Sequence, residues 1–441
     1  MKRKLINSFL ILTSSTLITK VFSLFNRMLL SRLLDENGMA LYILVIPTLS
    51  LCITLAQFSI PSAVFRLISH PKYNNKKVII SALCICLATC LLIIGGLLFF
   101  SKIIALYFLK QSDAYLPLLC ILPFIPLVGI SGIIKNYYLG REDVWNLSLA
   151  QLFEEVSRIL FTYIVIQQFH YLLMTYLVSI AILAMSIGEL TSILFLMLRL
   201  KRKLNWHYHP ISYFQKHFIF KDMMNIALPL TGSRLLHVCY NFLEPILLVS
   251  ILTKLHIGEN QIHLQYAIIN GYVISLLVTP TFFNNVVLRL LIPILNKDIA
   301  YNRLEALKKH VFYSLVICFF ISLPFTLIFY FYGDVCLQIM YNTTKGYRCL
   351  QYMCIPFTIF YLQTPLSATL QAFNKNKEMF MMSTFEVIIE LICLIILIPR
   401  FHVESVAIVM LIGLFSTLMF STYFVYQLVY RRKKKSIAEY L

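Results

Sequence analysis

Charged residues are scarce in this sequence: Asp, Glu, Lys and Arg make up 13% of its 441 residues, while 59% are hydrophobic. Soluble globular proteins carry about 25% charged and about 45–50% apolar residues. A chain of this length with half the usual charge could not cover a folded surface with water-compatible side chains. The deficit excludes a cytosolic enzyme, a disordered protein and a secreted disulfide scaffold, and it indicates a membrane protein.

Several motifs are also missing. The 11 cysteines are scattered through apolar runs without a CxxC pair, so we interpret them as small hydrophobic residues and expect no metal site. No GxxxxGK[ST] phosphate loop is present, which argues against an ATP-driven pump. No polar connection is long enough for a folded domain of about 50 residues, which weighs against a membrane glycosyltransferase or polymerase. We therefore expect neither enzymatic activity nor a cofactor.

Hydrophobic segments of about 20 residues, the length that spans a bilayer, account for most of the chain. Twelve segments qualify, at approximately residues 5–33, 38–68, 78–100, 114–138, 145–168, 172–198, 222–251, 262–293, 311–332, 349–372, 379–399 and 403–430. The alternating pattern of a membrane β-barrel is absent. The sequence thus predicts an all-α polytopic membrane protein with 12 transmembrane helices, bent at internal prolines such as Pro47, Pro61, Pro126, Pro280, Pro324 and Pro356.

Basic residues predict the orientation of these helices. Counting Lys135 with the connection after the fourth segment, one set of connections holds 25 Lys and Arg residues, and the alternate set holds 7. The positive-inside rule then places both termini and the long basic loop at 199–221 in the cytoplasm. The net charge of +19 lies mostly on that face, where anionic lipids are its expected partner and no nucleic acid is needed.

The same loop predicts two halves. We expect a six-helix lobe at 1–200, a basic linker at 201–221, a second six-helix lobe at 222–430 and a basic tail at 431–441. Six segments on each side, both sets starting in the cytoplasm, would be parallel repeats, a layout that is common in transporters.

Twelve charged residues remain within the segments. They are Lys20, Arg27, Arg66, Arg158, Arg234 and Arg289, and Glu154, Glu155, Glu189, Glu244, Glu386 and Glu390. Because an ionised group at bilayer depth costs about 2.5–3.5 kcal/mol or more, each is expected to face a partner or a wet cavity. We infer a polar cavity between the helices.

Helical spacing groups these residues into stripes. The stripes are Lys20 with Arg27; Gln151, Glu154, Glu155 and Arg158; Arg234, His237, Asn241 and Glu244; Asn285 with Arg289; and Glu386 with Glu390. Plainer interpretations also exist. Glu154 and Arg158 can neutralise each other within one helix, Arg66 and Arg289 can anchor headgroups, and His237 can be a buried hydrogen-bond partner. Glu189 has no partner that the sequence identifies.

Two site predictions follow from the residue types. Arginine and lysine suit a phosphate or another anion, so Lys20, Arg27, Arg66, Arg234, Arg289, Asn241 and Asn285 are predicted to line a central cavity for substrate. The second set, for ion coupling or charge balance, is Glu154, Glu155, Arg158, Glu244, Glu386, Glu390 and His237. Both signs together fit either an amphiphilic anionic substrate or ion-coupled transport of a cationic drug.

Several motifs resemble the stage V sporulation protein B family of the multidrug/oligosaccharidyl-lipid/polysaccharide flippase superfamily. They are an IPSAVFR stretch at Ile60–Arg66, Leu34 and Gly38 before it, and NYYLGREDVWNLSLAQLFEEVSRI, matching at Tyr138, Gly140, Gln151, Glu154 and Arg158. The regions around Glu244 and Arg289 are similar as well. Ser59 and Asn136 stand where this family usually has glycine, and twelve segments rather than fourteen point to its shorter YkvU-type members or to Wzx flippases.

The resemblance implies a two-lobed, V-shaped bundle like those of MATE and MurJ transporters. It also implies that a single polypeptide moves a polyprenyl-diphosphate-linked oligosaccharide to the outer leaflet of the bacterial cytoplasmic membrane. Alternating access without ATP would be driven by the membrane potential, Na⁺ or H⁺. Two alternatives remain: a cation-coupled multidrug exporter of the same superfamily, and a non-transporting membrane assembly factor.

Overall fold

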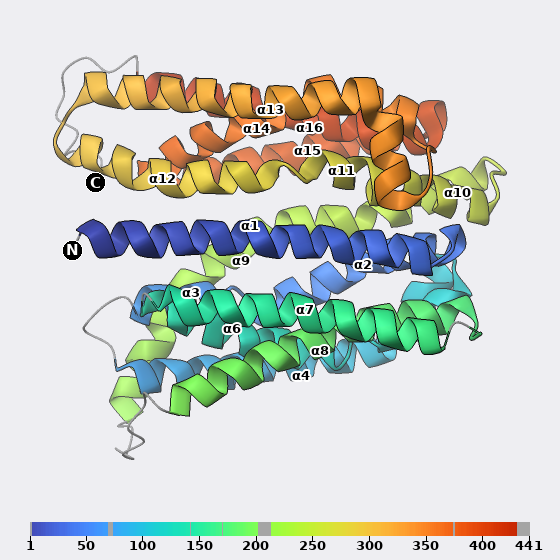
Figure 1. Cartoon of the computed structure of the whole chain (residues 1–441), viewed down its shortest axis with the longest axis horizontal. Helices are drawn as coiled ribbons and strands as arrows, with labels where there is room; N and C mark the ends of the chain where they lie inside the picture. The colour runs from blue at the N-terminus through green and yellow to red at the C-terminus, as the bar shows by residue number, and fades with distance from the viewer. Residues whose placement is uncertain are drawn as a thin grey trace. The chain divides into compact units, whose positions relative to one another are not determined.

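The computed structural model describes residues 2–68, 74–141, 143–169, 171–201, 213–373 and 375–429, and within these ranges it contains helices and no strand (Figure 1). The first part comprises α1 (Lys2–Leu33), α2 (Glu36–Gln57), α3 (Ile60–Ile68), α4 (Asn75–Ile103), η1 (Ile104–Phe108), η2 (Ser112–Ala114), α5 (Tyr115–Leu119), α6 (Phe124–Gly140), α7 (Val144–Gln168) and α8 (Met174–Lys201). The second comprises α9 (Tyr213–Lys254), α10 (Glu259–Tyr266), η3 (Ala267–Ile274), α11 (Ser275–Val278), α12 (Thr281–Ala300), α13 (Leu304–Tyr341), α14 (Tyr347–Ala372), α15 (Asn376–Phe401), η4 (His402–Glu404) and α16 (Ser405–Val429).

Each of the twelve predicted segments coincides with one helix or with a run of consecutive helices, so the all-α fold class is confirmed. Among the described residues, seven helical stretches are long and apolar enough to cross a membrane, or eight if the bent pair α5 and α6 counts as one span. Helix α7 is not one of them, because Glu154, Glu155 and Arg158 interrupt its apolar sequence. The chain is thus a multi-pass membrane protein, and the number twelve stays a prediction.

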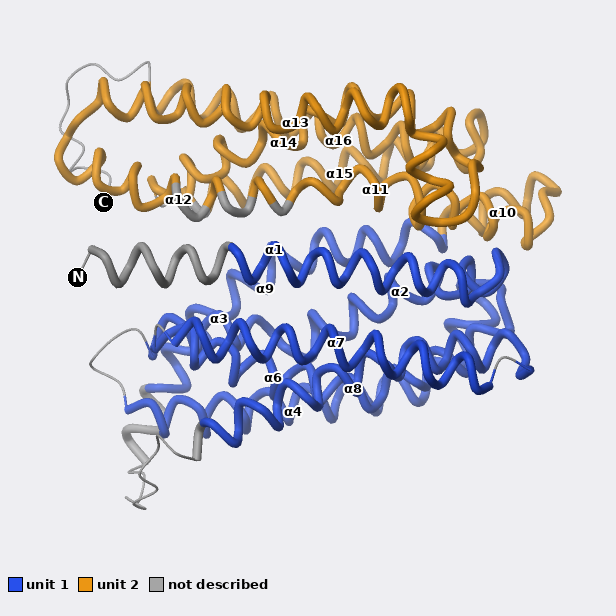
Figure 2. Tube along the Cα trace, in the orientation of Figure 1, with its two compact units in different colours: residues 1–246 blue, residues 247–441 orange. Residues whose placement is uncertain are grey.

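Two compact units make up the chain, residues 1–246 and residues 247–441 (Figure 2). The division falls within α9, which continues through Pro229 and Pro245. The first part of α9 packs on the core of unit 1 through Ile219, Met223 and Ala227. The predicted linker at 201–221 lies mostly outside the described residues, as does the predicted tail at 431–441, so these boundaries stay predictions.

Helix α6 is the centre of unit 1, where it packs against α3, α4 and α8. Glycines permit this close packing. A Cβ atom at Gly129 would lie 2.6 Å from Cys86 Sγ on α4, and one at Gly132 would lie 3.0 Å from Pro61 Cγ on α3. Small residues at such contacts let helix backbones approach closely, which is the main source of helix association in lipid.

Unit 2 repeats this packing. Helix α14 packs against α12, α13 and α16, and α15 packs against α16, just as α6 contacts α3, α4 and α8 and α7 contacts α8. An internal duplication would produce this shared arrangement.

The second predicted segment is broken. Helix α2 ends at Gln57, Phe58 and Ser59 adopt left-handed conformations with φ of 45° and 48°, and α3 begins at Ile60. The break directly precedes Pro61, which fits the second position of a new helix because an N–H there needs no intrahelical partner. By contrast, Pro47 and Pro356 lie inside helices that continue on both sides.

Candidate functional site

Five charged side chains meet between α6, α7 and α8, and we name them the ion cluster: Lys135, Glu154, Glu155, Arg158 and Glu189. Lys135 Nζ lies 2.5 Å from Glu154 Oε2 and 2.8 Å from Glu189 Oε2. On the other side of Glu154, Arg158 Nη2 lies 2.9 Å from Oε1, and Arg158 Nη1 lies 3.3 Å from Glu155 Oε1. The five side chains are only 9–16% exposed, so they are largely shielded.

Burial makes this network a strong structural constraint. Removing two opposite charges from a polar environment is costly, and the cost is recovered only when geometry and hydrogen bonding are good. Glu154 satisfies this condition because its two oxygens bind two different cations. Within the described part of the chain, no three His, Cys, Asp or Glu side chains form a set that could hold a metal ion.

Small and hydroxylated residues bring α7 and α8 close enough for the cluster to form. A Cβ atom at Gly188 would lie 3.0 Å from the backbone oxygen of Glu154 and 3.4 Å from Arg158 Nε. One turn away, the hydroxyls of Ser157 and Thr191 lie 2.7 Å apart and form a hydrogen bond. The pattern of small residues thus fixes the spacing at which the ionic groups meet.

Helix α1 brings two further cations to this network. It packs along α7, where Ser148 Oγ donates a hydrogen bond of 2.8 Å to Ser15 Oγ. Lys20 interacts electrostatically with Glu155. Arg27 interacts in the same way with Tyr42 on α2, and Tyr42 also interacts with Arg158. Lys20 is thus near the α7 stripe, and Arg27 is near Tyr42.

The prediction that Lys135 belongs to a loop is wrong. The residue lies inside α6, five positions before its last residue, and its ammonium group is buried between two glutamates. It also supplies the partner that the sequence could not name for Glu189. A signal was available, since position 135 falls within the hydrophobic segment 114–138. The correction lowers the larger set of loop cations by one and leaves the orientation argument intact.

The remaining candidates are distributed over both units, which the structure describes separately. In unit 1, Arg66 is exposed in the last turn of α3, Arg234 and Asn241 are exposed on α9, His237 is half-buried and Glu244 is buried. In unit 2, Glu386 is half-buried and Glu390 is buried, with its carboxylate beside Gly413 on α16. Asn285 and Arg289 belong to α12, but their side chains lie outside the described residues.

Sequence comparisons match this chain to a polysaccharide biosynthesis protein family and to two sporulation proteins. A family model described as polysaccharide biosynthesis protein matches residues 5–299. Stage V sporulation protein B of Bacillus subtilis (strain 168) is 26% identical over 387 residues, covering 85% of this chain and 74% of that protein. Sporulation protein YkvU of the same organism is 22% identical over 364 residues, covering 80% of this chain and 79% of the relative.

Solved structures share the fold across nearly the whole chain. A multidrug resistance MATE family transporter of the MOP superfamily, in its inward-facing conformation, superposes with a TM-score of 0.70 at 14% identity, covering 97% of this chain and 99% of that one. The MATE multidrug transporter DinF-BH gives a TM-score of 0.70 at 15% identity, covering 98% of this chain and 97% of that one. At these identities the likeness establishes the fold alone.

Proposed function

The chain belongs to the polysaccharide biosynthesis protein family, and from this premise we propose that it is a flippase for a polyprenyl-diphosphate-linked oligosaccharide. Transport runs from the inner to the outer leaflet of the bacterial cytoplasmic membrane, in the synthesis of cell wall, spore envelope or surface polysaccharide. The observation that carries the proposal is the pair of basic side chains on α1, Lys20 near Glu155 of the ion cluster and Arg27 near Tyr42.

Basic groups suit an anion, and here they come from two places. Lys135 and Arg158 hold carboxylates at 2.5–3.3 Å and are engaged in the internal network. Lys20 and Arg27 lie on the α1 side of that network, and the Lys20 side chain is exposed. A diphosphate that leaves the headgroup region loses hydration, and charge-assisted hydrogen bonds from such groups offset that loss.

In this mechanism Arg27 and Arg234 bind the diphosphate, and Lys20, Arg66, Arg289, Asn241 and Asn285 line the path of the polar headgroup. The polyprenyl tail stays in lipid. Rocking of one half against the other alternates access without ATP. The membrane potential drives transport in this proposal, since moving one charge through 100 mV is worth about 2.3 kcal/mol. Protons or Na⁺ bound at Glu244, Glu386, Glu390 or His237 are the alternative form of coupling.

Substitution of Arg27 and Arg234 tests the proposal. Arg27→Gln and Arg234→Gln should each lower flipping of lipid-linked oligosaccharide about tenfold or more, because a hydrogen bond to a charged group contributes about 1.5–3 kcal/mol. Arg27→Lys should retain partial activity, since it keeps the charge and loses the bidentate fork. The measurement is complementation of a flippase-deficient strain, with activity normalised to the amount of protein in the membrane.

Arg32→Gln is the matched control, because Arg32 is exposed in the last turn of the same helix and should flip substrate normally. Wild-type flipping by Arg27→Gln and Arg234→Gln at normal abundance would reject the anion-binding mechanism. A multidrug exporter or a non-transporting assembly factor would then replace it.

A further inference from the structure

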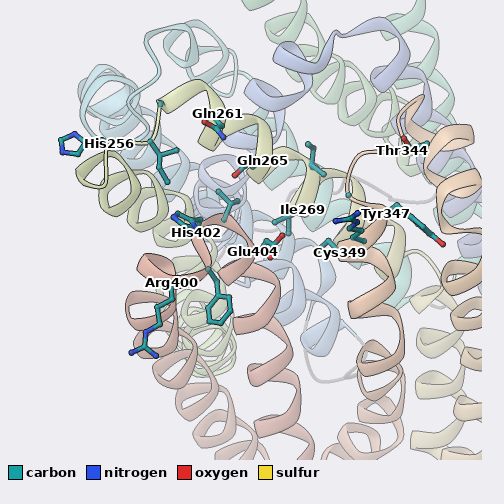
Figure 3. A pocket seen from close by; sticks show the side chains of 17 residues that line it. His256, Gln261, Gln265, Ile269, Thr344, Tyr347, Cys349, Arg400, His402 and Glu404 are labelled. Carbon is teal, nitrogen blue, oxygen red and sulfur yellow. The ribbon is translucent and has the colours of Figure 1, made fainter.

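Unit 2 contains a cavity of about 970 Å³ at the end where three helix connections meet (Figure 3). The connections join α9 to α10, α13 to α14, and α15 to α16 through η4. Polar lining residues come from all three: Gln261, Gln265, Thr344, Arg348, His402 and Glu404. Apolar side chains such as Ile269, Phe401 and Val403 complete the wall. A size of about 300–1,000 Å³ and a few convergent polar groups are typical of a small-molecule site.

The polar groups converge from different elements. In Figure 3, Gln265 of α10, His402 and Glu404 of η4, and Ile269 of η3 point toward the centre of the cavity, while Arg400 points away from it. An imidazole, a carboxylate and two amides together offer both donors and acceptors. Such a mixture matches a ligand rich in hydroxyl groups, each of which donates and accepts.

The backbone of His402, one of the lining residues, is strained. His402 adopts φ 51° and ψ −130°, a conformation in the left-handed half of the map that L-residues rarely adopt. A residue held in a sparsely populated conformation of this kind costs of order 1–3 kcal/mol, and such residues cluster at ligand sites. Glycine would relieve the strain, yet the position carries a side chain that points into the cavity.

The wall formed by η3 is tightly packed against the connection between α13 and α14. Residues Ala267–Ile274 form a π-helix, a form that is rare and is found frequently at functional sites. Gly346, with φ 90°, packs its backbone so closely on this wall that a Cβ atom would lie 2.7 Å from Ile268 Cγ2 and 2.9 Å from Val273 Cγ2. The loop that carries Thr344 is thereby packed against η3.

We propose that this cavity is a binding site for a sugar that carries a carboxylate. Glu404, Gln261, Gln265 and His402 bind the hydroxyl groups, and the Arg348 guanidinium binds the carboxylate, for which its planar fork is suited. This proposal rests on the proposed function in one respect, because transport of the oligosaccharide is what supplies saccharide at the membrane. Under the predicted topology, the cavity opens on the non-cytoplasmic side, where it receives the saccharide after transport.

Saturation-transfer NMR on the full chain in detergent tests the site with two matched probes, glucuronate and glucose. The wild-type protein should bind glucuronate about tenfold more tightly than glucose. Arg348→Gln should lower the affinity for glucuronate to that for glucose and leave the affinity for glucose unchanged. His402→Gly should weaken both sugars and at the same time raise the melting temperature by about 2 °C or more, because it releases backbone strain.

Asn302→Gly is the control, since Asn302 also has a positive φ of 54° but lies in the α12–α13 connection outside the cavity. It should not change binding. Equal binding of the two sugars, no binding of either, or a fall in melting temperature for His402→Gly would each overturn the proposal. Displacement of glucuronate by inorganic phosphate at equal concentration would also overturn it, and would assign a phosphate or lipid-headgroup site instead.

The outcome is separable from that of the proposed function. A protein that binds glucuronate but flips no lipid-linked oligosaccharide keeps the site and loses the transport proposal. Normal flipping without sugar binding removes the cavity site alone.

Discussion

Lys135 is the residue on which the ion cluster depends, because it contacts glutamates from two different helices. Lys135→Gln would leave Glu154 with one cation and Glu189 without this ammonium group, both in a shielded site. Breaking a buried pair by removing one partner costs about 3–5 kcal/mol. We expect a large drop in melting temperature and in the amount of protein in the membrane. Thermal unfolding of the purified protein measures the first, and quantitative immunoblotting measures the second.

A second substitution distinguishes ion pairing from packing. Adding Glu189→Gln to Lys135→Gln removes one stranded carboxylate and should recover part of the lost stability. Lys308→Gln is the control, because Lys308 pairs with the 82% exposed side chain of Glu305 and such surface pairs contribute about 0–1 kcal/mol. If Lys135→Gln behaved like Lys308→Gln, the ion cluster would not be a structural anchor.

At the same scale, sequence spacing identifies only local pairs. The i,i+4 spacing of Glu154 and Arg158 predicts their contact, and the structure shows it at 2.9 Å. The contact of Lys135 with Glu189 joins residues 54 positions apart. No helical period specifies such a pair, because it depends on how α6, α7 and α8 pack against each other.

The break between α2 and α3 is the clearest departure from a regular element. Ser59 is 2% exposed, has a φ of 48°, and among the described residues its Oγ has no hydrogen-bond partner. Left-handed backbone costs an L-residue about 1–2 kcal/mol, and glycine avoids this cost. Ser59→Gly should therefore stabilise the protein by about 1–2 kcal/mol, measured by thermal unfolding in detergent.

Two neighbouring variants separate the contributions to this gain. Ser59→Ala removes the unsatisfied hydroxyl and keeps the backbone strain, so it should stabilise less than Ser59→Gly. Ser62→Gly, in the first turn of α3, should not stabilise the protein, because its backbone is helical and glycine is less favourable than serine there. A loss of stability in Ser59→Gly would show that the break is not strained.

Element positions follow from the sequence, whereas their irregularities do not. Hydropathy locates a helix in each of the twelve segments, even in α7, where Glu154, Glu155 and Arg158 interrupt the apolar sequence. The π-helix at Ala267–Ile274 cannot be recognised from hydropathy. Its hydrogen bonds join residues five apart instead of four, and this change does not alter the apolar character of the sequence. The sequence predicts a bend at Pro61, which directly follows the break between α2 and α3.

For the whole molecule, the sharpest prediction concerns orientation. In a cysteine-free background, Lys345→Cys in the connection before α14 should react with a membrane-impermeant maleimide added to intact cells. Lys203→Cys in the long basic loop should react only after the cells are opened. The expectation follows from the excess of Lys and Arg in the loops on one side.

Labelling of Lys203→Cys in intact cells would show that the topology is the reverse of the predicted one. The unit 2 cavity would then open on the cytoplasmic side. The arrangement of the two halves is beyond what composition can specify, because the same apolar surfaces satisfy several packings in lipid. The division at the basic loop, with six segments on each side, stays a prediction, and the structure divides the chain within α9.

The ion cluster also has a consequence for how the chain is made. Lys135, Glu154 and Glu189 lie on three consecutive long helices of the described chain, α6, α7 and α8. Each helix carries charge that a lone segment would have to take into lipid, at about 2.5–3.5 kcal/mol per group. Glu189 gains its contact with Lys135 only once α8, the third helix, has been synthesised. We therefore expect the three helices to enter the bilayer together, because Lys135 pairs with carboxylates on both of the other two.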